Sequence, residues 1–174
     1  GNIVLMGGHD PLVMPSILKN DVWLSTSGGA IWTQLTANAG WSERISHTSE
    51  ALPDGSIVLM GGWDENLNTD VWRSADGVKS WIQMTASAGW EARYGHTSVI
   101  LPDGSIVLMG GNDGTFNLKN DVWRSTNGGK NWTQLTTNPG WTGRQGHTSV
   151  ALPDGSIVLM GGWDGTELKN DVWR

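Results

Sequence analysis

The chain has 174 residues, of which 37% are hydrophobic and 16% charged, so it is long and apolar enough to bury a globular core. Its net charge of −6 argues against binding to nucleic acid or to an anionic membrane surface, and no apolar stretch is long enough for membrane insertion. The absence of cysteine excludes disulfides, thiolate catalysis and a zinc-thiolate site.

A repeat of about 50 residues runs through the whole chain. The sequence Asp-Gly-Ser-Ile-Val-Leu-Met-Gly-Gly occurs at 54–62, 103–111 and 154–162, and a shorter copy occurs at 2–8. We therefore interpret residues 1–174 as a single array of four units, of which the first and the last are partial. The units span 1–46, 47–95, 96–146 and 147–174.

Each complete unit contains four short β-prone segments in the same order, as the second unit illustrates. Its segments are 47–50, a continuous apolar run at 57–60, then 70–73 and 81–85. The Pro-Asp-Gly sequence at 53–55 has the residues of a tight turn that would join the first two segments. Gly and Pro interrupt every stretch that could hold a helical period. The sequence thus predicts an all-β protein built of four-stranded antiparallel sheets.

The array is incomplete at both ends. The first unit lacks the first segment and the last unit lacks the fourth, so the predicted sheets have 3, 4, 4 and 3 strands. Stacked units leave apolar faces and strand edges open at the ends of such an array. We therefore expect self-association, or additional units from a longer chain.

Aromatic and basic residues recur at fixed spacings in the units. After Trp72 come Trp81, Trp90, Arg93 and His96, and the other units repeat this order. Residues that recur so strictly are expected to pack the units together. The Arg and His residues are expected to hydrogen-bond neighbouring strands or turns, because equivalent residues of different units lie too far apart to share a metal ion.

These features resemble the kelch repeat. The order Arg-x-x-His-Thr, an apolar strand ending in Gly-Gly, Asp-Val-Trp and Trp-x-Gln is similar to a kelch blade over essentially the whole chain. The resemblance implies a β-propeller of four-stranded antiparallel kelch-like blades, about 3.5 of them in this chain.

A second motif, at 25–32, 74–81 and 125–132, is similar to the Asp-box hairpin of sialidases. Ser27 replaces the Asp in the first copy, and Val78 replaces the Gly in the second. The Asp-box marks a hairpin and not an active site.

The loop between Gly-Gly and Asp-Val-Trp varies in length between units, and in the first unit it includes 9–15. Such insertions gather on one face of a repeat protein, which is often the binding face. Trp63 and Trp163 open this loop in two units only, so packing does not require a tryptophan there. The predicted ligand-binding residues are His9, Asp10, Trp63, Asp64, Asn112, Asp113, Trp163 and Asp164.

The aspartates in and after this loop match no calcium-loop spacing, so turn capping is their expected role and calcium binding is the less favoured alternative. They are Asp10, Asp21, Asp64, Asp70, Asp113, Asp121, Asp164 and Asp171.

We expect no catalytic residues, no cofactor and no metal site. The sequence favours a non-catalytic binding or scaffold module that contacts a protein or glycan through its variable loops. The alternative is a lectin in which Trp63 and Trp163 stack on sugars. A sialidase-like Asp-box glycosidase is least favoured, because Tyr94 is the only tyrosine and no arginine cluster stands out. The absence of cysteine, the low charge and the Trp- and Asn-rich composition favour a secreted or cell-surface protein.

Overall fold

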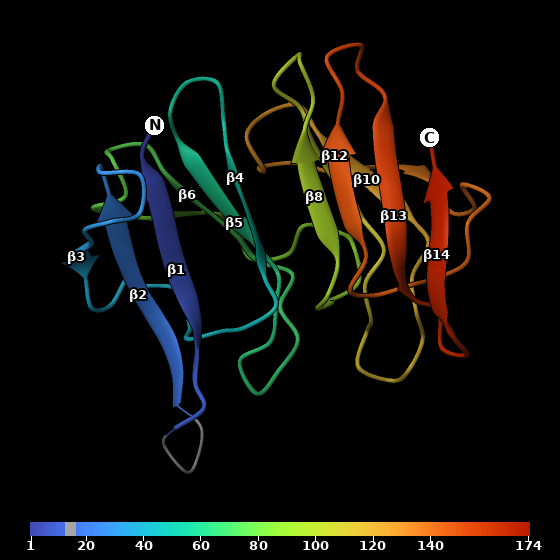
Figure 1. Ribbon diagram of the computed structural model, residues 1–174, viewed down its shortest axis with the longest axis horizontal. Helices are drawn as coiled ribbons and strands as arrows, with labels where there is room; N and C mark the ends of the chain where they lie inside the picture. Colours follow the sequence, from blue (N-terminus) through green and yellow to red (C-terminus); the bar gives the residue numbers. More distant parts are fainter. Residues whose placement is uncertain (13–16) are drawn as a thin grey trace.

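The computed structural model describes residues 1–12 and 17–174, which form four antiparallel β-sheets (Figure 1). The described part of the chain contains no helix long and apolar enough to cross a membrane. The sheets stand side by side as blades, and the first and last blades lie at opposite ends of the array (Figure 1). The fold is an incomplete β-propeller, as the repeat predicts.

The blades have three, four, four and three strands, which confirms the predicted pattern. The first blade contains β1 (Ile3–Asp10), β2 (Ile17–Ser25) and β3 (Thr33–Thr36). The second contains β4 (Thr48–Ala51), β5 (Ile57–Met60), β6 (Val71–Ser74) and β7 (Ile82–Thr85). The third contains β8 (Thr97–Ile100), β9 (Ile106–Met109), β10 (Val122–Ser125) and β11 (Thr133–Thr136). The fourth contains β12 (Thr148–Ala151), β13 (Ile157–Trp163) and β14 (Leu168–Trp173).

The predicted Pro-Asp-Gly turn joins the first two strands of a complete blade. In the second blade, the Leu52 amide donates to the Ser56 carbonyl at 2.8 Å and the Gly55 amide donates to the Leu52 carbonyl at 2.9 Å. Gly55 has a φ of 82°, a conformation that glycine adopts without steric cost. The Asp54 carboxylate also accepts from the Ser56 amide at 3.0 Å, so the turn residues set the β4 to β5 register.

Apolar side chains fill the space between successive blades. In β5, Val58, Leu59 and Met60 are fully buried, so the continuous apolar run is covered on both faces of the sheet. Leu59 belongs to the cluster that contains Val22 of the first blade, whereas Val58 and Met60 pack with Ile106 of the third. The first strands β4, β8 and β12 contact one another in sequence, so they form the inner side of the array.

A buried arginine joins each blade to the next, and we call this arrangement the joint. The Arg93 carbonyl accepts from the Gly62 amide of the second blade at 3.1 Å. Its fully buried guanidinium donates to the Gly110 carbonyl of the third blade at 3.0 Å and to both carboxylate oxygens of Asp121, at 2.5 and 2.9 Å. Burial tends to raise the pKa of Asp121, but the hydrogen bonds and charge of Arg93 outweigh it and keep this pKa below its usual range.

The same joint occurs twice more, between Arg44 and Asp70 and between Arg144 and Asp171. The prediction that Asp70, Asp121 and Asp171 cap turns is therefore wrong. Each also accepts a hydrogen bond from the indole of the Asp-Val-Trp tryptophan two residues later. Each carboxylate thus fixes the linker arginine against its blade, because a bidentate guanidinium–carboxylate pair holds two chain segments in one geometry.

Two of the three joint histidines hydrogen-bond the inner strand of the preceding blade, which agrees with their predicted role. His96 Nε2 lies 3.0 Å from Thr48 Oγ1, and His147 Nε2 lies 2.9 Å from Thr97 Oγ1. Burial and the nearby arginines lower the pKa of His96 to about 3 and those of His47 and His147 to about 4. The imidazoles are therefore neutral parts of the blade interfaces at pH 7.

The Gly-Gly sequence lets the preceding linker approach the blade closely. A Cβ on Gly62 would lie 2.7 Å from the Ile45 carbonyl oxygen, whereas a Cβ on Gly8 would meet nothing within 4 Å.

This close approach can be tested by replacing each glycine with alanine. Both glycines have a positive φ, so the backbone strain of a Gly→Ala change is similar at the two sites. We expect Gly62→Ala to lower the free energy of unfolding by about 1 to 3 kcal/mol more than Gly8→Ala, measured by urea denaturation. Equal losses would contradict the close approach.

Candidate functional site

The variable loops lie together at one end of the blades, at the lower edge of Figure 1. Each loop or its edge exposes a large apolar side chain. The exposed fractions are 93% for Leu12, 38% for Trp63, 84% for Phe116 and 82% for Leu168. One face of the array therefore presents apolar side chains to solvent, as a binding face would.

The predicted residues of the third and fourth loops support turns. Asn112 is buried and its side-chain oxygen accepts from the Gly114 amide at 2.8 Å. Asp113 binds the Thr115 amide at 3.0 Å and the Lys119 ammonium at 2.9 Å. Trp163 is half-buried and bridges to Gln145.

Asp164 occupies the fourth-blade position equivalent to Asp113. Hydrogen bonds from the Lys169 side chain and the Glu167 and Thr166 amides hold the pKa of Asp164 well below its usual range. Its carboxylate is 2.8 Å from the Lys169 ammonium. These bonds order the loop, so Asp164 acts there as the predicted turn cap.

The predicted residues of the first two loops are placed differently. His9 is exposed on the long β1–β2 hairpin, and Asp10 accepts from the Leu12 amide at 3.0 Å. Asp64 accepts from the Asn66 amide at 3.1 Å. Residues 13–15 of the predicted first loop lie outside the described part of the chain.

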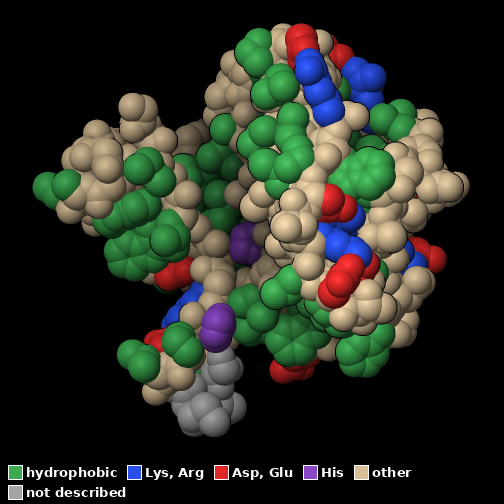
Figure 2. Space-filling view, turned by 45° about the vertical axis from the view of Figure 1, so that its right-hand side comes forward, with side chains coloured by type: hydrophobic (Ala, Val, Ile, Leu, Met, Phe, Trp, Pro, Cys, Tyr) green, Lys and Arg blue, Asp and Glu red, His purple; other side chains and the backbone are tan. Residues whose placement is uncertain are grey.

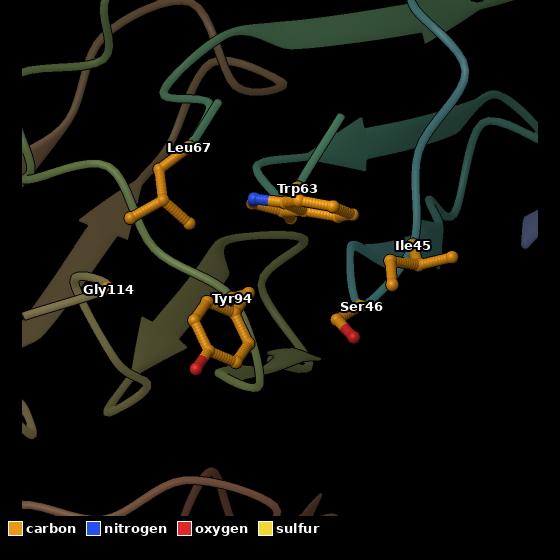
Figure 3. A pocket seen from close by; sticks show the side chains of 6 residues that line it. All are labelled: Ile45, Ser46, Trp63, Leu67, Tyr94 and Gly114. Atoms are coloured by element: carbon orange, nitrogen blue, oxygen red, sulfur yellow. The ribbon is translucent and has the colours of Figure 1, made fainter. Parts of the chain in front are cut away.

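A pocket of about 340 Å³ opens on the loop face between the second and third blades (Figure 3). In Figure 3 the Trp63 indole and the Tyr94 ring lie on opposite sides of the opening, with Leu67 at one end. No lining side chain is charged, so the pocket suits a neutral ligand such as a sugar or an apolar side chain. The lining residues are Ile45, Ser46, Trp63, Leu67, Tyr94 and Gly114. Of the eight predicted residues, only Trp63 lines this pocket.

The interblade linkers bring Ile45, Ser46 and Tyr94 to the pocket, whereas Leu67 and Gly114 come from variable loops. Ile45 forms a β-bridge with Trp63, and Tyr94 forms one with Asn112, so each linker runs beside the loop of its own blade. The Gly95 amide donates to the Ser46 carbonyl at 3.3 Å, which joins consecutive linkers. Tyr94 consequently lies next to the loop of the preceding blade.

Sequence reasoning missed Tyr94 and Phe116. The linker position directly after the joint arginine holds Ile45, Tyr94 and Gln145 in the three joints, and this variation between the constant Arg and His could have marked it. Phe116 is the only phenylalanine and lies inside a variable loop, which is also a visible signal.

Glu50 is a further departure from the repeat, because Val99 and Val150 occupy its position in the other inner strands. Burial raises its pKa, and Ser98 Oγ of the neighbouring strand donates to it at 2.7 Å. Within residues 1–12 and 17–174, no three His, Asp or Glu side chains are placed to hold a metal ion. The functional features of the described chain therefore centre on the loop face.

The chain matches a known protein family. The model of the DUF6242 beta propeller domain matches residues 45–174, which is most of the chain. The match begins at the linker that enters the second blade and includes every residue of the pocket. No curated protein matches the chain.

Proposed function

Because the chain belongs to the DUF6242 beta propeller domain family, we propose that it is a non-catalytic binding module whose ligand contacts the loop face. The observation that carries the proposal is the uncharged pocket between Trp63 and Tyr94. Phe116 and Leu168 expose apolar surface on loops of the same face. A ligand that enters the pocket and covers these side chains would remove that surface from water.

A protein is the first candidate ligand. Leu12, Phe116 and Leu168 are each more than 80% exposed, and only a surface as wide as a protein's could cover side chains spread over several blades. The pocket would then receive one apolar side chain of the partner, as a hot-spot pocket does.

A glycan is the second candidate, and Trp63 favours it. Its indole is 38% exposed in a pocket that also carries the Tyr94 ring and the Ser46 hydroxyl. Aromatic faces stack on the apolar face of a sugar ring, and hydroxyl groups bind its polar edge. Trp163, the other tryptophan predicted to stack, is half-buried and forms a β-bridge with Gln145 where Trp63 has the pocket.

We also propose that the blades are of the kelch type with Asp-box-like hairpins. Asp76 Oδ1 accepts from the Lys79 and Ser80 amides at 3.0 Å each, as a short side chain capping a hairpin would. In the third blade, the Trp132 indole donates to the Gly129 carbonyl at 3.0 Å. These bonds support a structural role for the hairpins, so cleavage of a fluorogenic sialoside by the chain would overturn the non-catalytic proposal.

The pocket is tested by Trp63→Ala. Selection of a displayed peptide library and a glycan array against the chain would supply ligands of the two candidate classes. We expect any ligand of the pocket to bind Trp63→Ala at least about 30-fold more weakly, because a central aromatic anchor contributes about 2 kcal/mol or more. Fluorescence titration of each selected ligand would measure the change.

Trp163→Ala is the matched control, since it removes the same side chain from the equivalent position of the fourth blade. Binding that survives in Trp163→Ala and is lost in Trp63→Ala supports the pocket. Ligands that bind both variants as tightly as the parent chain would contradict it. A chain that binds no glycan would exclude the lectin.

A further inference from the structure

Glu50 stands at a position of the inner strand where the repeat packs valine. In β8 the equivalent Val99 is buried in the apolar cluster that contains Leu159 of the fourth blade. Glu50 brings a carboxylate to the corresponding place between the second and third blades, where Ser98 Oγ of β8 donates to its Oε1. A carboxylate at a packing position costs stability unless a partner compensates its loss of hydration. Its presence therefore points to a role other than packing.

This carboxylate has no counterion in the described part of the chain. Burial raises the pKa of Glu50, and the Ser98 hydrogen bond offsets that effect only in part, with no lysine or arginine nearby to lower it. His147 lies in the same pocket, but burial and the charge of Arg144 lower its pKa to about 4, so it is neutral at pH 7. In Figure 2, most of the visible lysine and arginine side chains lie at the top and right of the view, away from the hollow beside the first blade.

The carboxylate lines a polar pocket of about 290 Å³ formed by the inner strands β4, β8 and β12. Apart from Glu50 and His147, each lining residue is a serine or a threonine. Ser149 Oγ, on β12, is shielded from solvent and has no hydrogen-bond partner among the described residues. A buried hydroxyl without a partner carries a desolvation cost that a bound ligand can recover. We call this site the inner-strand pocket, and it shares no residue with the pocket of the loop face.

We propose that the inner-strand pocket binds a primary ammonium group carried by a small hydroxylated molecule, with Glu50 as its counterion. An ammonium has three donors, so it can bind the Glu50 carboxylate and two hydroxyl oxygens at the same time. The hydroxyl groups of the ligand would pair with other serine and threonine side chains, Ser149 among them, because a hydroxyl both donates and accepts. The attraction between ammonium and carboxylate is stronger in a partly buried pocket than in water, since less water screens it.

A metal ion fits this pocket less well than an organic cation. Calcium takes about six to eight oxygen ligands, usually with several carboxylates among them, whereas Glu50 is the one carboxylate among the described lining residues. The pocket is also much larger than a single ion, because one water molecule takes up about 30 Å³. Its volume of about 290 Å³ suits a molecule of several non-hydrogen atoms.

The proposal is tested by isothermal calorimetry of the whole chain with serinol and glycerol. Both are three-carbon molecules with two terminal hydroxyls, and serinol has an ammonium group where glycerol has its central hydroxyl. We expect serinol to bind at one saturable site and glycerol not to bind. Glu50→Gln should weaken serinol binding at least about tenfold, because the hydrogen bond to a charged group is lost. Titrations with potassium and calcium chloride test the metal ions.

Glu50→Val gives a second variant that is expected to fold, since Val99 and Val150 occupy the same position in the other inner strands. It should abolish serinol binding and raise the urea midpoint, because a carboxylate leaves a packing position. Glu43→Gln removes an exposed glutamate and is the matched control, which should bind serinol as the parent chain does.

Serinol binding that glycerol equals, or that persists undiminished in Glu50→Gln, would overturn the proposal. So would the absence of serinol binding, or the uptake of potassium or calcium in its place. A lower urea midpoint in Glu50→Val would overturn it as well, because Glu50 would then serve the packing of the blades.

Discussion

Replacing Arg93 with alanine is expected to lower the free energy of unfolding by about 3 to 5 kcal/mol, the cost of removing one partner from a buried ion pair. Arg93 is fully buried and binds Asp121, whose side chain is only 15% exposed. Without the guanidinium, the Asp121 carboxylate and the Gly110 carbonyl lose their buried donor. Urea denaturation followed by tryptophan fluorescence would measure the loss.

Arg124→Ala is the matched control on the same blade. Arg124 pairs with Asp103, but the two side chains are 33% and 55% exposed, so water screens the pair and replaces its hydrogen bonds. We expect this variant to lose much less stability than Arg93→Ala. Equal losses would show that the joint does not hold the blades together.

The fold is expected to lose stability on acidification at pH values well above those at which carboxylates titrate. The three joint histidines have an unfolded pKa of 6.5, and burial lowers their folded pKa to about 4 for His47 and His147 and about 3 for His96. As the pH falls below 6.5, these histidines bind protons in the unfolded chain but stay neutral in the folded chain. The free energy of unfolding therefore decreases. Each histidine contributes up to about 1.4 kcal/mol per pH unit until its folded pKa is reached.

Urea midpoints at pH 8, 7, 6 and 5 would measure this dependence. These histidines should add no slope between pH 8 and 7, and the midpoint should fall steeply between pH 6 and 5. His147→Gln should reduce the slope by about a third, since it removes one of three contributing groups. His9→Gln removes an exposed imidazole from β1 and is the control. An unchanged slope in His147→Gln would contradict the neutral buried state.

The blade architecture could be predicted because its signals are local. The Pro-Asp-Gly turn, the apolar run of β5 and the Gly-Gly bulge each lie within a few residues, and they recur in register. The packing role of Trp41, Trp90 and Trp141, predicted from strict recurrence, is confirmed by their burial.

The joints could not be predicted, because their partners are far apart in sequence. Arg93 and Asp121 are separated by 28 positions, and nothing local distinguishes Asp121 from a turn-capping aspartate such as Asp113. Val78 is a similar case: it has a φ of 65° and is buried in the cluster with Val22. Sequence shows that valine replaces a glycine there, but not that its apolar contacts offset the backbone strain.

The candidate site could be predicted only in part for the same reason. The variable loop pointed to Trp63, which lines the pocket. Its opposite wall, Tyr94, belongs to the linker, and that linker reaches the loop of the preceding blade only through the stacking of whole blades. Asn112 had the right loop position, yet its buried side chain faces its own turn.

Among the residues that the structure describes, the Trp63–Tyr94 pair of the pocket occurs once, although the scaffold around it is repeated. The equivalent position between the third and fourth blades has the buried Asn112 where the second blade has Trp63, and Gln145 where the third has Tyr94. Valency is therefore set by the number of chains in an assembly and not by the number of blades. A multivalent ligand would gain avidity only from several chains held together, with an effective concentration fixed by their spacing.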